Sequence, residues 1–231
     1  MPPVSTSTDG PNFRSFSPTT NPVRVFPRLS LILGGGSDDF EILPSVTRTM
    51  NFRLSVRDNN NGYGCSAYDG MVITTNASAG PFLINYPNLE EDWDVGDNKT
   101  ITWDVANTTA SPVRCSNVDI LLSTDGGLNF TTTLASNIPN DGSHNITVPN
   151  VASSLCRIKI KCSDNIFFDI NDANITIGVT ISCATFTSSD VPVAISSTGT
   201  PTVTSDLNIS IGETIADINV KDLIGDHTYV G

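Results

Sequence analysis

The residues with the most specific spacing in this sequence lie in and beside a single Asp-Gly-Gly turn. They are Ser123, Asp125, Gly127 and Phe130. An Asp side chain can accept hydrogen bonds from backbone N–H groups of its own turn, and glycine tolerates positive φ angles. We expect the ring of Phe130 to pack beneath the turn. The spacing therefore predicts a structural turn between two strands, and not a reaction centre.

Histidines are too few for a hydrolytic site. The chain has two, His144 and His227, and neither lies in a His-Glu-x-x-His zinc motif or beside a nucleophile elbow. A serine nucleophile would also need a histidine base next to it. We therefore predict no catalytic, cofactor-binding or metal-binding residue in this chain, and no enzymatic activity of the chain alone.

Acidic residues gather in three turns, Asp38–Asp39, Glu90–Asp92 and Asp169–Asp172. Clustered carboxylates are ligands that calcium takes, which makes calcium a candidate cofactor, although the spacing of an EF-hand is absent. The alternative is that all three are solvated loops of an acidic protein. The net charge of −12 argues against nucleic acid as a partner, because no basic patch is available to bind phosphates.

Five cysteines, at positions 65, 115, 156, 162 and 183, form no Cys-x-x-Cys motif. Disulfide bonds are therefore the expected use. Cys156 and Cys162 cannot pair with each other, because six residues of extended strand separate their Cα atoms by about 20 Å. We predict a Cys115–Cys156 disulfide. The odd total leaves at least one thiol free or bonded outside this chain.

Alternation of apolar and polar residues predicts an all-β fold. In the strand at residues 48–57, four side chains are expected to face inward: Met50, Phe52, Leu54 and Val56. Further strands are expected at residues 71–75, 82–85, 99–105, 118–123, 129–134, 144–148, 156–162, 166–169 and 173–177. Short strands separated by Asn, Asp, Gly and Pro turns are typical of tandem immunoglobulin-like or fibronectin-like β-sandwiches, and we expect Trp103 in the core.

Composition divides the chain into four parts. We predict a linker at residues 1–22, a small and incomplete β domain at 23–78, an Ig-like sandwich at 79–178, and an incomplete third β domain at 183–231. Residues 26–33 fit either a short edge strand or a helical turn. Because the small domain has few strands, we expect its sheet to pack on a neighbour or to be completed by residues upstream.

Cysteines suited to disulfides indicate a secreted or cell-surface protein. The first residues have neither the basic start nor the apolar core of a signal peptide, and no stretch is long and apolar enough for a membrane span. We therefore expect this chain to be a fragment whose N-terminal part is missing.

Seven segments together resemble the region that follows the catalytic domain in secreted bacterial reprolysin-like zinc metalloproteases. They are Val25–Leu29, Glu41–Asp58, Ala79–Phe82, Thr102–Val105, Val118–Gly127, Pro139–Ser143 and Asn165–Ile170. The resemblance covers residues 13–177. It implies a secreted protease parent whose zinc lies in a catalytic domain outside this chain, so that no catalytic residue can be carried over.

Two further resemblances concern shorter stretches. Residues 183–231 resemble the first half of a proprotein convertase P domain (P/Homo B), on the segments Asp190–Ile195, Ile215–Val220 and Gly225–Gly231. That domain is a β-sandwich that accompanies secreted proteases and often binds calcium. The turn at Asp125 resembles an Asp-box, a motif found in sialidase-type propellers and in many unrelated β domains.

We predict a non-catalytic C-terminal accessory region of a secreted zinc metalloprotease, with its own upstream catalytic domain as partner. Such a region would stabilise that domain, space it from the cell surface or present substrate. The main alternative is an adhesive or glycan-binding module that binds protein or glycan ligands. Its aromatic platform would comprise Tyr63, Tyr68, Tyr86 and Trp93. A sialidase-type enzyme is a third interpretation.

Overall fold

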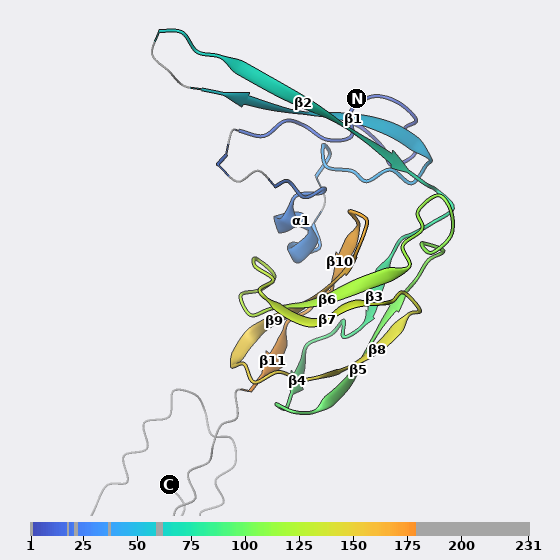
Figure 1. Ribbon diagram of the computed structural model, residues 1–231, viewed down its shortest axis with the longest axis vertical. Coiled ribbons are helices and arrows are strands. Elements are labelled where there is room, and N and C mark those ends of the chain that lie inside the picture. Colours follow the sequence, from blue (N-terminus) through green and yellow to red (C-terminus); the bar gives the residue numbers. More distant parts are fainter. Residues whose placement is uncertain (1, 18, 21–22, 37, 59–61, 179–231) are drawn as a thin grey trace, which may run out of the picture. The chain divides into compact units, whose positions relative to one another are not determined.

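The computed structural model describes residues 2–17, 19–20, 23–36, 38–58 and 62–178. All described residues belong to one unit of the chain, Met1–Ile181. The predicted third β domain, with Cys183, His227 and the P/Homo B resemblance, lies outside the described residues. Within them, the structure has one helix and eleven strands (Figure 1). The all-β prediction is confirmed for this part of the chain. None of its helices has the length and hydropathy needed to cross a membrane.

The first described module contains helix α1 and a long β-hairpin. α1 spans Leu29–Gly34, so the segment that fitted either an edge strand or a helical turn is helical. Gly35 ends the helix in the left-handed conformation, with φ of 61°, which glycine adopts without steric penalty. Strands β1 (Arg48–Arg57) and β2 (Ser66–Thr75) pair antiparallel along their whole length.

The prediction that four side chains of β1 face inward is correct only for the first two, Met50 and Phe52. Met50 and Phe52 are half-buried, and the rings of Phe13 and Phe26 pack on Phe52 with centroid distances of 6.1 and 4.8 Å. Leu54 and Val56 were predicted to face a core, yet they are 59% and 61% exposed. Alternation identified the apolar face, but nothing in the described part of the chain covers its outer half.

The linker predicted at residues 1–22 is wrong for the part that contacts Arg48. The buried Arg48 guanidinium donates hydrogen bonds to the backbone carbonyls of Ser7 and Gly10, at 2.9 and 2.6 Å, and to the Asn12 side chain at 2.7 Å. A buried guanidinium must find acceptors, and this polar segment supplies them. The polar composition of this N-terminal segment therefore reflects its role in accepting hydrogen bonds from Arg48.

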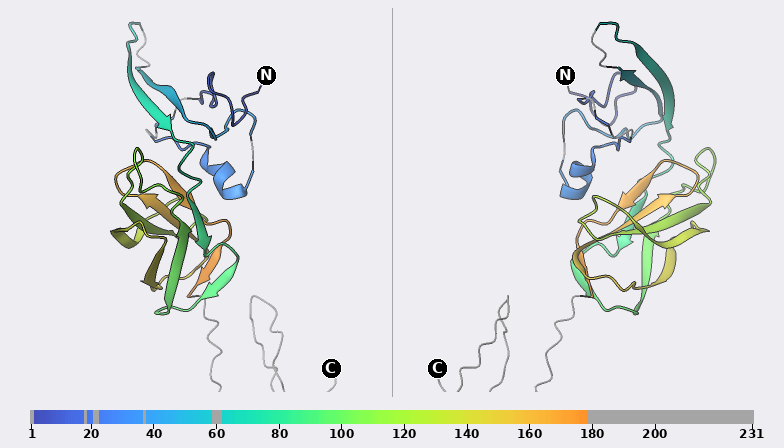
Figure 2. Two further views of the ribbon diagram at one scale, coloured as in Figure 1. Left: turned by 90° about the vertical axis from the view of Figure 1, so that its right-hand side faces the viewer. Right: turned by 60° about the vertical axis from the view of Figure 1, so that its left-hand side comes forward.

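The second module is a two-layer β-sandwich. One sheet has three antiparallel strands in the order β3 (Leu83–Tyr86), β5 (Asn98–Asp104) and β8 (Ser143–Thr147). The other has the order β4 (Glu91–Trp93), β11 (Ile175–Ile177), β9 (Ser153–Cys162), β6 (Asn117–Ser123) and β7 (Thr132–Pro139), and β10 (Phe168–Ile170) also pairs with β9. β4 and β11 are parallel, whereas the other pairs are antiparallel. Figure 2 shows the two sheets face to face.

Apolar side chains at period two fill the space between these sheets. The core residues with the clearest alternation are Ile101 and Trp103 on β5, Val118, Ile120 and Leu122 on β6, and Ile158 and Ile160 on β9. Trp103 is 3% exposed, which confirms its expected place in the core. Its indole Nε1 donates to the buried Asn140 Oδ1 at 2.8 Å, so the one polar atom of this ring is satisfied.

Most strands of the sandwich lie within two residues of their predicted bounds; the exceptions are β4, β7 and β9, which starts at Ser153 instead of residue 156. β4 was not predicted, because its three residues are Glu91, Asp92 and Trp93, and two acidic residues do not suggest a strand. β7 starts at Thr132 instead of residue 129, because Asn129 belongs to the turn around Asp125.

Candidate functional site

The Asp125 turn lies directly after β6 and is held by its own side chains. Ser123 Oγ donates to Asp125 Oδ1 at 2.6 Å and accepts the N–H of Gly127 at 2.9 Å. Asn129 donates its backbone N–H to Asp125 Oδ1 at 2.9 Å and its side-chain amide to Oδ2 at 2.7 Å. The hydrogen bonds from Ser123 and then Asn129 lower the pKa of Asp125 to about 2. Both carboxylate oxygens are thus engaged within the turn.

Phe130 does not complete this turn in the expected way. Its ring is partly exposed and lies 5.4 Å from Lys159 Nζ, on β9. The same ammonium lies 3.8 Å from the ring of Phe168 on β10. Burial lowers the pKa of Lys159, and the nearby charge of Lys161 lowers it further. Of the four predicted turn residues, the structure brings together Ser123, Asp125 and Gly127, whereas Phe130 contacts Lys159.

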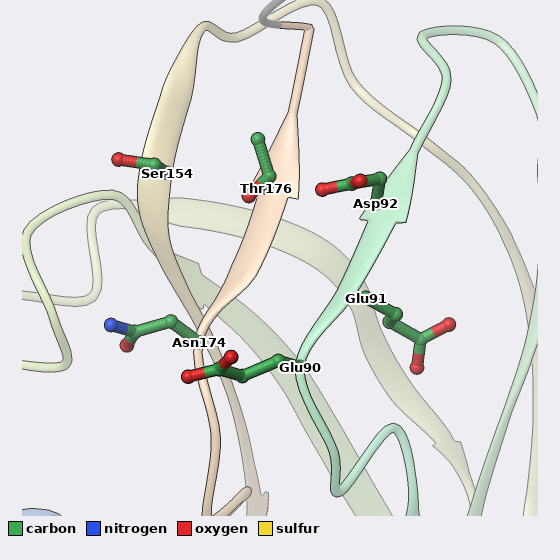
Figure 3. A pocket seen from close by; sticks show the side chains of 6 residues that line it. All are labelled: Glu90, Glu91, Asp92, Ser154, Asn174 and Thr176. Atoms are coloured by element: carbon green, nitrogen blue, oxygen red, sulfur yellow. The ribbon is translucent and has the colours of Figure 1, made fainter. Parts of the chain in front are cut away.

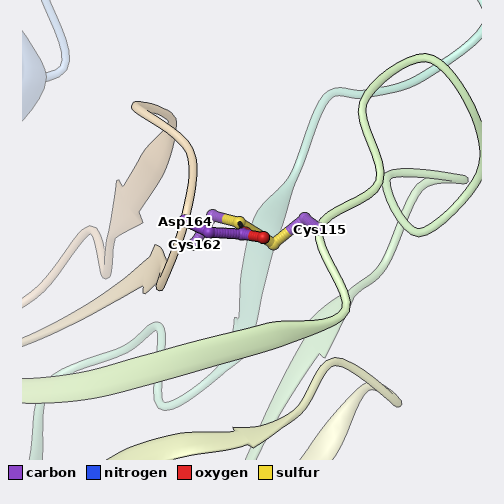
Figure 4. Close-up of side chains that lie close together, drawn as sticks. All are labelled: Cys115, Cys162 and Asp164. Atoms are coloured by element: carbon purple, nitrogen blue, oxygen red, sulfur yellow. Dashed lines mark hydrogen bonds between the residues drawn. A yellow bond between two sulfur atoms is a disulfide. The ribbon is translucent and has the colours of Figure 1, made fainter.

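The predicted Cys115–Cys156 disulfide is wrong, because Cys115 bonds to Cys162 (Figure 4). β6 and β9 pair antiparallel with Val118 opposite Cys162, so Cys115, just before β6, lies at the Cys162 end of β9. Cys156 lies six residues away on the same strand, where it is buried as a free thiol opposite Ile175. The register of β6 and β9 selects the partner. Cys65 is an exposed free thiol.

Asp164 lies next to this disulfide, with Oδ1 3.1 Å from Cys162 Sγ. Cys115, Cys162 and Asp164 form the one group of three metal-type ligands found among the described residues. Both sulfur atoms are bonded to each other, so neither is a thiolate that could bind a metal ion. With the two cysteines joined in a disulfide bond, this group is a structural crosslink.

One of the predicted acidic turns lines a hollow of about 340 Å³ on the outer side of β4, β11 and β9. Figure 3 shows Asp92 directed toward Thr176, Glu90 toward Asn174, and Glu91 on the other side of its strand. Ser154 of β9 completes the lining on the β11 side. Carboxylate, amide and hydroxyl oxygens on or just before three strands are the ligand types that calcium takes, but calcium binding at this hollow stays a prediction.

The other two acidic turns are engaged in structural contacts. Asp38 accepts the N–H of Phe40 at 2.9 Å, which is the main cause of its lowered pKa, and it also pairs with Arg14 and Arg28. Asp169 on β10 accepts the N–H of Ile84 on β3 at 2.7 Å. Burial raises the pKa of Asp169. These two carboxylates are therefore part of the fold.

The aromatic platform proposed for a glycan-binding module does not exist. Trp93 is 2% exposed and belongs to the core. Tyr86 stacks on it at 6.4 Å and donates its hydroxyl to Glu91 Oε2 at 2.7 Å. Tyr63 and Tyr68 are exposed on the β1–β2 hairpin, and the Arg53 guanidinium lies 4.2 Å from the Tyr68 ring. Trp93 is thus unavailable to a ligand, and Tyr86 is half-buried against it, so these four rings do not form one exposed platform.

The hairpin surface is the site that sequence reasoning missed. We define it as Leu54, Val56 and Met71, which lie on one face of the hairpin and are each at least 50% exposed; Tyr68 and Val72 are exposed on the opposite face. A hollow of about 470 Å³ lies beside Gly70, where the missing side chain leaves room between Arg53 and Val72. Exposed apolar residues grouped in this way mark interaction sites. The available sequence signal was the small number of strands in residues 23–78.

Residues 86–156 match the model of the Kre9/KNH-like N-terminal Ig-like domain. The matched region runs from the end of β3 into β9 and so includes strands of both sheets. Among curated proteins the sequence has no match. With the two-sheet topology, this similarity makes the sandwich an Ig-like module of the accessory or binding type.

Proposed function

We propose that this chain is a non-catalytic accessory region of a secreted zinc metalloprotease, and that it stabilises the catalytic domain, spaces it or presents substrate. The resemblance to the post-catalytic region of reprolysin-like proteases, and that of residues 183–231 to a P/Homo B domain, support the protease parent. The Ig-like sandwich supports the accessory role. The observation that carries the proposal is the hairpin surface.

Leu54, Val56 and Met71 expose 59%, 61% and 50% of their surface on one face of the hairpin. Full burial of such a side chain contributes roughly 1.5–3 kcal/mol. A two-stranded hairpin is at best marginally stable in water without further packing. Contact with the parent's catalytic domain would supply that packing, and the hairpin surface is our proposed point of attachment.

The proposal assigns zinc and the catalytic residues to the parent's catalytic domain. His144, the one histidine in the described ranges, lies in β8, where it faces Ile101 of β5. The metal-type cluster of the same ranges has both its cysteines in the disulfide. That disulfide, between buried residues, also supports a secreted or cell-surface location.

A protease assay of the isolated chain tests the non-catalytic part of the proposal. Unfolded casein is incubated with the chain and added zinc, with thermolysin as the positive control. We expect no cleavage above the buffer rate. Robust proteolysis that a chelator abolishes would contradict the proposal.

The parent polypeptide tests the attachment. Its coding sequence must contain a His-Glu-x-x-His motif, and a parent without one would refute the protease assignment.

In that parent, Leu54→Asp should lower the melting temperature of the catalytic domain, because it places a charge in the proposed contact. Leu128→Asp is the matched control, since Leu128 is 64% exposed on the sandwich. Equal effects of the two variants would refute attachment through the hairpin.

A further inference from the structure

β1 and β2 form an isolated two-stranded sheet, so each has one edge that no other described strand pairs. An edge of ten residues presents a row of backbone N–H and C=O groups that can pair with another strand. Such edges are usually blunted by lysine, proline or a bulge. β2 has no lysine or proline, and its pairing with β1 is regular from Ser66 to Thr75.

The side chains along β2 are largely apolar and exposed. Tyr68, Met71 and Val72 are 68%, 50% and 65% exposed, and Asp69 is the one charged residue of the strand. β1 carries Arg53 near its middle and Arg57 at its end. The β2 edge therefore carries one acidic residue, whereas the β1 edge carries basic residues. This difference decides which edge is better suited to pair with a strand of a second copy.

We propose that a second copy of this chain pairs with the hairpin through the β2 edge, antiparallel and about a two-fold axis at Met71. This axis places Gly70 opposite Val72 of the second copy. That valine then fills the hollow beside Gly70, where an added Cβ would meet nothing closer than the Phe52 carbonyl oxygen at 3.9 Å. A glycine within a strand is where another backbone can approach closely.

The charged side chains favour pairing of the two copies through the β2 edge over pairing through the β1 edge. With the axis at Met71, Asp69 lies opposite Ile73 of the second copy, so the two Asp69 carboxylates are neither opposite nor diagonal to each other. A two-fold axis at the middle of β1 places the two Arg53 side chains directly opposite or diagonal, where like charges destabilise a sheet. The result is a four-stranded sheet in the order β1, β2, β2, β1, with Leu54, Val56 and Met71 of both copies on one face.

Sedimentation equilibrium of the whole chain over a range of concentrations tests this inference, with Val72→Lys as the variant. Lysine at this position places an ammonium beside Gly70 of the second copy, next to that copy's Arg53. The two-fold axis places the lysine at two equivalent positions in the dimer. Because both positions are affected, we expect the dimer Kd to rise roughly tenfold. Val56→Lys is the matched control, since Val56 is 61% exposed on β1, and it should leave the Kd within twofold.

Hydrogen exchange supplies a second readout that does not depend on the variants. Every second amide of residues 67–75, on the edge that faces away from β1, should gain protection as the concentration rises, whereas the amides of the sandwich should not change. A chain that stays monomeric at all concentrations would overturn the inference. So would a dimer whose Kd is the same in the natural chain and in Val72→Lys. Neither result depends on whether the parent is a protease.

Discussion

Asp119 of β6 and Lys161 of β9 lie directly opposite each other, with 2.9 Å between Oδ2 and Nζ. The other oxygen of Asp119 accepts hydrogen bonds from Ser136 Oγ at 2.9 Å, the Asn137 N–H at 2.8 Å and Ser163 Oγ at 3.1 Å. One carboxylate therefore connects β6, β7 and the end of β9. Burial opposes its ionisation, but these four partners outweigh burial and lower the pKa of Asp119 to about 2.

Stability should fall in acid because of this carboxylate. Its folded pKa is below its ordinary value of 3.8, so the stabilisation is fully present above pH 5 and is lost as the pH falls toward 2. Asp119→Asn should cost about 1–3 kcal/mol at pH 7 and flatten the dependence between pH 5 and 2. Urea unfolding at several pH values measures both. Asp94→Asn, at an exposed position, is the control, and an equal effect of this change would contradict the prediction.

The Cys115–Cys162 disulfide should contribute about 4 kcal/mol, because it closes a loop of 47 residues in the unfolded chain. Cys115→Ser with Cys162→Ser should lower the melting temperature by many degrees, whereas Cys65→Ser, which changes an exposed free thiol, should not. Peptide mapping without reduction identifies the bond directly. A peptide that links Cys115 to Cys156 would show that the pairing described above is incorrect.

Asn140 should be among the most sensitive polar positions of the sandwich. Besides accepting from Trp103, its amide donates to Thr108 Oγ1 and to the Cys115 carbonyl oxygen, both at 3.0 Å. Asn140→Leu leaves these buried partners unsatisfied and should cost roughly 3 kcal/mol. Unfolding in denaturant followed by tryptophan fluorescence gives the value. Asn150→Ala, at an exposed loop position, should change it by less than about 0.5 kcal/mol.

Asp169 should show the opposite pH behaviour to Asp119. Its folded pKa is raised, mainly by burial, so protonation stabilises the fold and this stabilisation is lost as the pH rises through the folded pKa. Asp169→Asn keeps an oxygen for the Ile84 N–H without the charge. It should therefore raise the melting temperature at pH 7 but not at pH 3. A variant less stable than the natural chain at pH 7 would contradict this reasoning.

The sequence by itself determined the all-β class, most strand positions in the sandwich and the burial of Trp103. Alternation at period two produces one apolar and one polar face, and this property is local to each strand. The Asp-Gly-Gly turn was likewise predictable, because the hydrogen bonds of Asp125 close within a few residues.

Only the tertiary structure decided which faces are covered and which strands are neighbours. Leu54 and Val56 alternate as well as Ile158 and Ile160 do, but only the latter pair meets an opposing sheet. Cys162 rather than Cys156 bonds to Cys115 because of the β6–β9 register, which no local pattern encodes. Trp93 is buried because β4 pairs with β11, a strand more than 80 residues later in the chain. Such contacts depend on long-range pairing, and residue order alone does not specify it.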